Sequence, residues 1–170
     1  GWQGSIPYFF PGGYDGRYFR ALAEANTLIA DHEEIVFEGR RLDPGARFRM
    51  AALSPLPALE GPARDGVEPH LLQGQEYVLG DRRLFAVGNF WQRGDVWVRL
   101  IPAELPAGGR FVWREISKNR VYADKAGSPV LTPAALREGV AVHVGALRWA
   151  FFTLEPWREG ADYGEPVLPE

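Results

Sequence analysis

The chain has 170 residues, of which 46% are hydrophobic and 13% aromatic, which is enough to bury a substantial core. The formal net charge is only −3, and no polybasic segment or bilayer-length apolar run occurs, so neither a nucleic acid nor a membrane is a predicted partner. The absence of cysteine excludes disulfides, thiolate nucleophiles and cysteine-bound zinc, and it leaves the cellular compartment open.

The first third of the chain has the order strand, glycine-rich loop, amphipathic helix. An apolar run at residues 6–10 precedes a loop at 11–16, in which Asp15 can cap the next helix. Apolar residues then recur at steps of three and four over residues 17–37, which predicts a helix that stops at Gly39. A single βα unit cannot form a parallel sheet, so we expect this part to be a remnant of, or a bridge to, an upstream domain. The first residue is Gly1, which is consistent with such a loss and equally with removal of an initiator methionine.

The rest of the chain alternates at the period of β-strands. Four prolines within residues 54–69 predict an irregular connection, and from about residue 73 apolar and polar residues alternate between turns rich in Gly, Pro and Asp. The predicted fold is therefore mainly β, an antiparallel β-sandwich with one N-terminal amphipathic helix. We divide it into an N-terminal segment and linker (1–62), the sandwich (63–158) and a tail (159–170).

No pattern in the sequence predicts a catalytic or metal site. The three histidines are far apart and lack the HxH or HExxH spacing of a metal site, and no serine lies in a GxSxG turn. The chain has 22 acidic residues, but their spacing selects no pair for glycoside hydrolysis. The sequence thus predicts no catalytic residue, no metal and no cofactor.

Six tryptophans are many for this length, and indole faces can stack on the C–H faces of sugar rings. Trp97 and Trp113 occupy the sparser faces of alternating strands, close in sequence to Arg99 and Glu115. An exposed pair there would bind a glycan. The alternative is that both faces of these strands are covered, one by the second sheet and the other by a neighbouring domain.

Three segments carry a family resemblance: residues 81–90 (DRRLFAVGNF), residues 145–156 (GALRWAFFTLEP) and, more weakly, the helix within 6–39. Together they resemble the C-terminal β-sandwich of TIM-barrel glycoside hydrolases, preceded by the last βα unit of the barrel. The catalytic carboxylates of that family lie on earlier barrel strands, so the resemblance assigns no catalytic residue here. It places Asp15 in the last loop at the C-terminal face of the barrel, where it would approach the substrate.

The resemblance implies a non-catalytic accessory domain of a carbohydrate-active enzyme, which stabilises an upstream catalytic barrel domain and has carbohydrate contact as a secondary role. The tryptophan content supports an alternative, an autonomous carbohydrate-binding, lectin-like β-sandwich module. A third hypothesis is a small enzyme whose site is assembled from scattered acidic residues. The candidate carbohydrate-binding residues are Trp97, Trp113 and Asp15.

Overall fold

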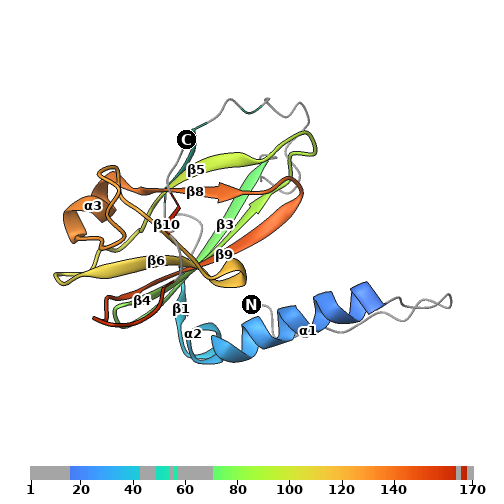
Figure 1. Ribbon diagram of the computed structural model, residues 1–170, viewed down its shortest axis with the longest axis horizontal. Coiled ribbons are helices and arrows are strands. Elements are labelled where there is room, and N and C mark those ends of the chain that lie inside the picture. The colour runs from blue at the N-terminus through green and yellow to red at the C-terminus, as the bar shows by residue number, and fades with distance from the viewer. Residues whose placement is uncertain (1–15, 43–48, 54–55, 57–70, 164–165, 168–170) are drawn as a thin grey trace. The chain divides into compact units, whose positions relative to one another are not determined.

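The computed structural model describes residues 16–42, 49–53, 56, 71–163 and 166–167, and it is mainly β, as predicted (Figure 1). The chain divides into two compact units, residues 1–33 and 34–170, which are described separately. The predicted strand at residues 6–10 and the predicted cap Asp15 lie outside the described residues.

The first unit contains α1 (Gly16–Asp31), and α2 (Glu33–Phe37) follows after a one-residue break. The sequence predicted one continuous helix over residues 17–37. The break falls at His32, whose backbone N–H donates to Ile29 at 3.1 Å, an i→i−3 bond of the tighter kind that ends helices. The predicted stop at Gly39 is confirmed, because a Cβ there would lie 2.1 Å from the carbonyl oxygen of Ile35.

The second unit contains two sheets. The larger has seven strands in the spatial order β1 (Arg40–Arg41), β3 (Leu72–Leu79), β4 (Arg82–Asn89), β9 (Arg148–Pro156), β6 (Phe111–Glu115), β7 (Arg120–Tyr122) and β10 (Pro166–Val167). The smaller has three, in the order β2 (Arg49–Ala52), β5 (Val96–Ile101) and β8 (Val140–Val144). The short helices η1 (Ile116–Lys118) and α3 (Pro133–Glu138) lie in the connections.

All strand pairs among the described residues are antiparallel except β7 with β10, so the larger sheet is mixed and not purely antiparallel as predicted. The reason is the connection: α3, β8 and β9 intervene between β7 and β10, which leaves the chain free to return in the parallel direction. The alternation of apolar and polar residues within one strand does not show whether its neighbour in the sheet will be parallel or antiparallel.

The predicted boundaries of the β unit are too narrow. Strands β1 and β2 pair with β3 and β5, although the sequence analysis placed them in the N-terminal segment 1–62, and β10 lies in the predicted tail. Each has two to four residues, and β1 consists of two arginines, so none shows an alternation that could be recognised. Short charged strands are typical of sheet edges, where they discourage pairing with other chains.

Both sheets contribute to one core. Phe85 and Phe152 of the larger sheet and Val98 and Val142 of the smaller belong to the same buried cluster, together with Leu136 of α3. On β4 and β9 the residues that alternate with this set lie on the outer face of the larger sheet: Ala86, Gly88, Trp149 and Phe151. This outer face carries the candidate site.

Candidate functional site

The structure corrects the predicted role of Trp113. Its side chain is fully buried and stacks on Phe85, with ring centroids 4.5 Å apart and planes at 15°. It cannot meet a sugar in this fold. The sequence could not fix which face of β6 points inward, because three consecutive residues, Phe111 to Trp113, are apolar and all are buried.

Trp97 is half-buried on β5 of the smaller sheet, opposite His143 of β8. The two rings meet edge to face at 5.4 Å and 63°. His143 Nε2 also lies 3.2 Å from Oδ2 of Asp95. Trp97 and Trp113 therefore belong to different sheets and do not form the exposed pair that the sequence suggested. The third predicted residue, Asp15, is outside the described part of the chain.

Two other aromatic residues form an exposed cluster, the aromatic platform, made of Phe90 and Trp149. Trp149 lies on the outer face of β9 and Phe90 directly follows β4. Phe90 is 42% exposed and Trp149 is 47% exposed, and their rings pack edge to face with centroids 5.8 Å apart and planes at 90°. Tryptophan is enriched at contact surfaces, because its side chain joins a large apolar face to a polar N–H group.

Gly88 forms the floor of the aromatic platform. It pairs with Trp149 across β4 and β9, and a Cβ at this position would lie 2.9 Å from Cε2 and 3.1 Å from Cδ2 of the indole. These two atoms form the bond that the two indole rings share. The indole therefore lies over the backbone of Gly88, and about half of its side chain stays exposed.

A buried asparagine fixes the loops beside the aromatic platform. Asn89 is 1% exposed, and its amide nitrogen lies within hydrogen-bond distance of three carbonyl oxygens, those of Gly94 at 3.1 Å, Gly145 at 3.2 Å and Val144 at 3.3 Å. Its Oδ1 accepts from the backbone N–H of Trp91 at 2.9 Å. One side chain thus holds the β4–β5 loop against the β8–β9 turn, and both loops flank the platform.

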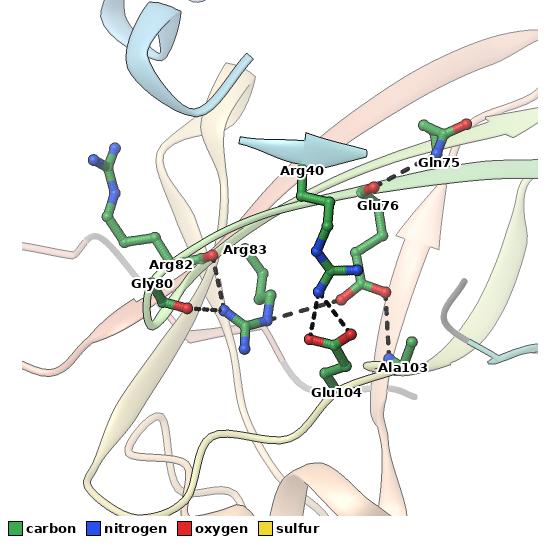
Figure 2. Close-up of polar contacts among 8 residues, drawn as sticks. All are labelled: Arg40, Gln75, Glu76, Gly80, Arg82, Arg83, Ala103 and Glu104. Atoms are coloured by element: carbon green, nitrogen blue, oxygen red, sulfur yellow. Dashed lines mark hydrogen bonds and ion pairs between the residues drawn. The ribbon is translucent and has the colours of Figure 1, made fainter. Parts of the chain in front are cut away.

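A cluster of charged residues lies at the β1 edge of the larger sheet (Figure 2). Glu76 is fully buried, with Oε1 4.0 Å from Nε of Arg83, and its Oε2 accepts from the backbone N–H of Ala103 at 3.3 Å. Arg83 Nη1 also donates to the carbonyl of Gly80 at 2.6 Å. Burial lowers the pKa of Arg83, and the charge of Glu76 partly offsets that effect.

Beside this buried pair, Nη2 of Arg40 on β1 donates to both carboxylate oxygens of Glu104, at 2.7 and 2.8 Å (Figure 2). Glu104 and Ala103 belong to the connection after β5, so the cluster links the edge of the larger sheet to the chain that leaves the smaller sheet. Glu76 is fully buried, and we interpret the cluster as a structural tie rather than a reactive centre.

A second buried carboxylate, Glu115, ends β6. Its oxygens lie 2.7 Å from Nζ of Lys118 and 3.8 Å from Nε of Arg120, and it accepts a hydrogen bond from the Tyr122 hydroxyl at 3.0 Å. That hydroxyl accepts from the backbone N–H of His143 at 3.4 Å, which joins β7 to β8 of the other sheet. Burial, reinforced by the charge of Glu115, raises the pKa of Tyr122 well above its ordinary value.

This raised pKa predicts weaker stability in alkali. Above pH about 10 the unfolded chain loses the Tyr122 proton while the folded chain keeps it, so the free energy of unfolding should fall by about 1.4 kcal/mol per pH unit from this group alone. The contribution is fully present below about pH 10 and is lost as pH rises towards the folded pKa. Urea titrations followed by circular dichroism should show a shallower alkaline slope in Tyr122→Phe, and equal slopes would contradict the assignment.

Sequence reasoning missed the aromatic platform, although a signal for it exists. In residues 148–154 the apolar set Ala150, Phe152, Leu154 has one phase, and Trp149 stands in the other, as a surface residue would. What the sequence could not reveal is that Gly88 lies opposite Trp149, because that pairing depends on the register between β4 and β9.

Two other kinds of functional site have less support in the structure than the aromatic platform. A shallow hollow of about 270 Å³ beside α3 is lined in part by Asp124, Thr132 and Glu138, and Glu138 is already paired with Lys125 at 2.8 Å. Within the described residues, no three metal-ligating side chains come together. In that same part of the chain, no helix combines the length and apolarity needed to cross a bilayer.

Comparison of the chain with protein-family models, with curated proteins and with solved structures finds no match.

Proposed function

We propose that residues 34–170 form a non-catalytic β-sandwich accessory module of a carbohydrate-active enzyme, and that this module contacts carbohydrate through the aromatic platform. The observation that carries the proposal is the exposed indole of Trp149, held flat on Gly88 and braced by Phe90. In the proposed protein, an upstream catalytic barrel domain supplies the reaction and this module supplies stability and binding.

The platform has the chemistry that sugar contact needs. A sugar ring offers apolar C–H faces and a rim of hydroxyls, so it binds best to a flat apolar surface with polar groups at its edge. The indole gives a rigid surface that loses little conformational entropy on binding. Gln73, exposed on β3, pairs with Gly88 on the side away from Trp149, and its amide can both donate to and accept from hydroxyls.

The third hypothesis, an active site built from scattered acidic residues, has less support. Within the part of the chain that the structure describes, the two fully buried carboxylates, Glu76 and Glu115, are committed to ion pairs and hydrogen bonds. A glycosidase needs two carboxyl groups that face each other across an open cleft. The platform instead offers stacking and hydrogen bonding, which bind a sugar without breaking its bonds.

The second candidate function is an autonomous carbohydrate-binding, lectin-like module. It is favoured by the common core of the two sheets, which lies entirely within residues 34–170. The same platform would serve both functions. They differ in whether the parent protein contains a catalytic barrel, so the sequence of the complete gene distinguishes them.

The proposal is tested by the binding of the purified chain to a panel of soluble polysaccharides and oligosaccharides, measured by affinity electrophoresis and calorimetry. Trp149→Ala should weaken binding at least tenfold, equivalent to about 1.4 kcal/mol, because the stacking surface is removed. Phe37→Ala is the matched control, since Phe37 is an exposed aromatic side chain on α2. Binding to no sugar in the panel, or equal loss in both variants, would overturn the proposal.

Gly88→Ala provides a sharper prediction, because it removes no aromatic group. The new methyl would lie 2.9 Å from the indole, so Trp149 must lift away from the sheet and from Phe90. We expect Gly88→Ala to lose at least half of the binding free energy that Trp149→Ala loses. Tryptophan emission should also shift to the red. Unchanged affinity would show that the flat position of the indole is not what binds the sugar.

A further inference from the structure

The two rings of the aromatic platform stand at right angles to each other. Their planes make an angle of 90°, with centroids 5.8 Å apart, and both rings lean over Gly88. A Cβ on Gly88 would lie 2.9 Å from Cε2 of Trp149 and 3.1 Å from Cε2 of Phe90. A flat ligand that lies parallel to one ring is therefore perpendicular to the other. The platform offers one stacking plane to such a ligand, not two.

The backbone beneath both rings is held in place. The backbone N–H of Phe90 donates to the carbonyl of Leu71 at 2.8 Å, and Asn89, the residue before it, is buried and tied by its side chain to both flanking loops. Trp149 pairs with Gly88 between two central strands of the larger sheet. The rings could become coplanar only if one side chain swung through a quarter turn and gave up the edge-to-face contact.

Within the described part of the chain, no other exposed aromatic side chain extends this plane. The exposed aromatic residues there are Phe37, Phe90 and Trp149. Phe37 lies on α2, which an ion pair ties to the first residue of β4, whereas Phe90 directly follows the last residue of that strand. Phe151, two residues beyond Trp149 on the same face of β9, is mostly buried. The platform therefore has the width of one stacking plane.

The number of coplanar rings decides which physical form of a carbohydrate a surface can hold. A crystalline polysaccharide presents many sugar rings in one flat face, so several coplanar aromatic rings are needed to hold it. A single chain in solution can place the apolar face of one sugar ring on one aromatic ring while the perpendicular aromatic ring contacts the edge of that sugar. Rings at a right angle suit the second form and obstruct the first.

Building on the proposed function, we infer that the aromatic platform holds one ring of a single, soluble carbohydrate chain and does not bind the flat face of a crystalline polysaccharide. Three matched pairs of probes test this inference: soluble cello-, chito- and manno-oligosaccharides of two to six rings, and crystalline cellulose, chitin and mannan. Where the wider panel identifies another sugar, its own oligosaccharides of the same lengths replace the soluble series.

Calorimetry with the full chain gives the first readout. From two to six rings the affinity should rise no more than about threefold, which is the ratio of the numbers of rings that can occupy one site. Trp149→Ala should weaken this soluble binding about tenfold and Phe90→Ala about threefold, because one ring stacks and the other contacts the edge of the sugar. Phe37→Ala should leave it unchanged, since Phe37 lies outside the platform.

Sedimentation with the crystalline solids gives the second readout. The bound fraction should be the same for the unmodified chain, Trp149→Ala and Phe37→Ala, because the platform does not engage a flat face. Loss of solid-phase binding in Trp149→Ala but not in Phe37→Ala would overturn this inference and leave the proposed function standing, and so would an affinity that rises tenfold or more from two to six rings. Binding of no probe, and of no sugar in the wider panel, would overturn both. Melting curves of each variant confirm that the module is folded in every comparison.

Discussion

Arg83→Met is expected to lower the free energy of unfolding by about 3–5 kcal/mol. Glu76 is fully buried and Arg83 is 5% exposed in its side chain, so the substitution removes a positive charge that offsets a carboxylate in the protein interior (Figure 2). Removing one member of a buried ion pair costs far more than the pair itself contributes, because the remaining charge keeps its desolvation penalty. Urea denaturation at neutral pH measures the effect.

Arg82→Met is the matched control for this prediction. Arg82 is the preceding residue of β4, its side chain is 36% exposed, and it pairs with Glu34 at 2.7 Å on the surface. Such exposed pairs contribute about 0–1 kcal/mol, so its loss should be small. The double variant Glu76→Gln/Arg83→Met should lose less than the sum of the single variants, because the two residues interact. Equal effects in Arg82→Met and Arg83→Met would contradict the interpretation.

Trp113→Ala is expected to lower the free energy of unfolding by about 3–5 kcal/mol, as other large-to-small changes of buried aromatic residues do. Trp113 is completely buried and stacked on Phe85, so the truncation leaves a cavity between the sheets. Trp149→Ala should cost about 1 kcal/mol or less, because its side chain is already half exposed. Denaturation curves of the two variants, recorded side by side, measure the contrast.

Tryptophan accessibility provides the second measurement for this pair. Acrylamide should quench less of the total emission in Trp149→Ala than in the unmodified chain, since the most exposed of the described tryptophans is gone. In Trp113→Ala the part of the emission that acrylamide quenches should be nearly the same as in the unmodified chain, because the lost indole was buried. A Trp113→Ala variant with wild-type stability would contradict the burial of Trp113 in the core shared by the two sheets.

The strands joined by tight turns could be predicted well from the sequence. The prediction of a strand over residues 96–101 matches β5, and those at 84–91 and 148–154 overlap β4 and β9 closely. Each has a clear alternation or a long apolar run between turn residues, and these are local signals. The helix stop at Gly39 was predictable for the same reason, because the conformation of a few residues decides it.

Features that depend on long-range pairing could not be predicted. The buried charges Glu76 and Arg83 break the rule that ionisable residues lie on the surface, and only the register of β3 with β4 shows that they are diagonal neighbours. For the same reason, the sequence could not show that Trp113 is buried and Trp149 is exposed. Both stand in apolar strands, and which face of each strand meets the second sheet is decided by the whole fold.

The nitrogen-bound protons of the indole rings offer the most direct test of the central claim. In a ¹H–¹⁵N spectrum of the chain labelled at its six tryptophans, titration with an oligosaccharide that binds should shift the Trp149 signal first and furthest. The fully buried Trp113 should stay in place. Shifts centred on Trp97 or Trp113 with Trp149 unmoved, at sugar concentrations that saturate binding, would contradict carbohydrate contact through the aromatic platform.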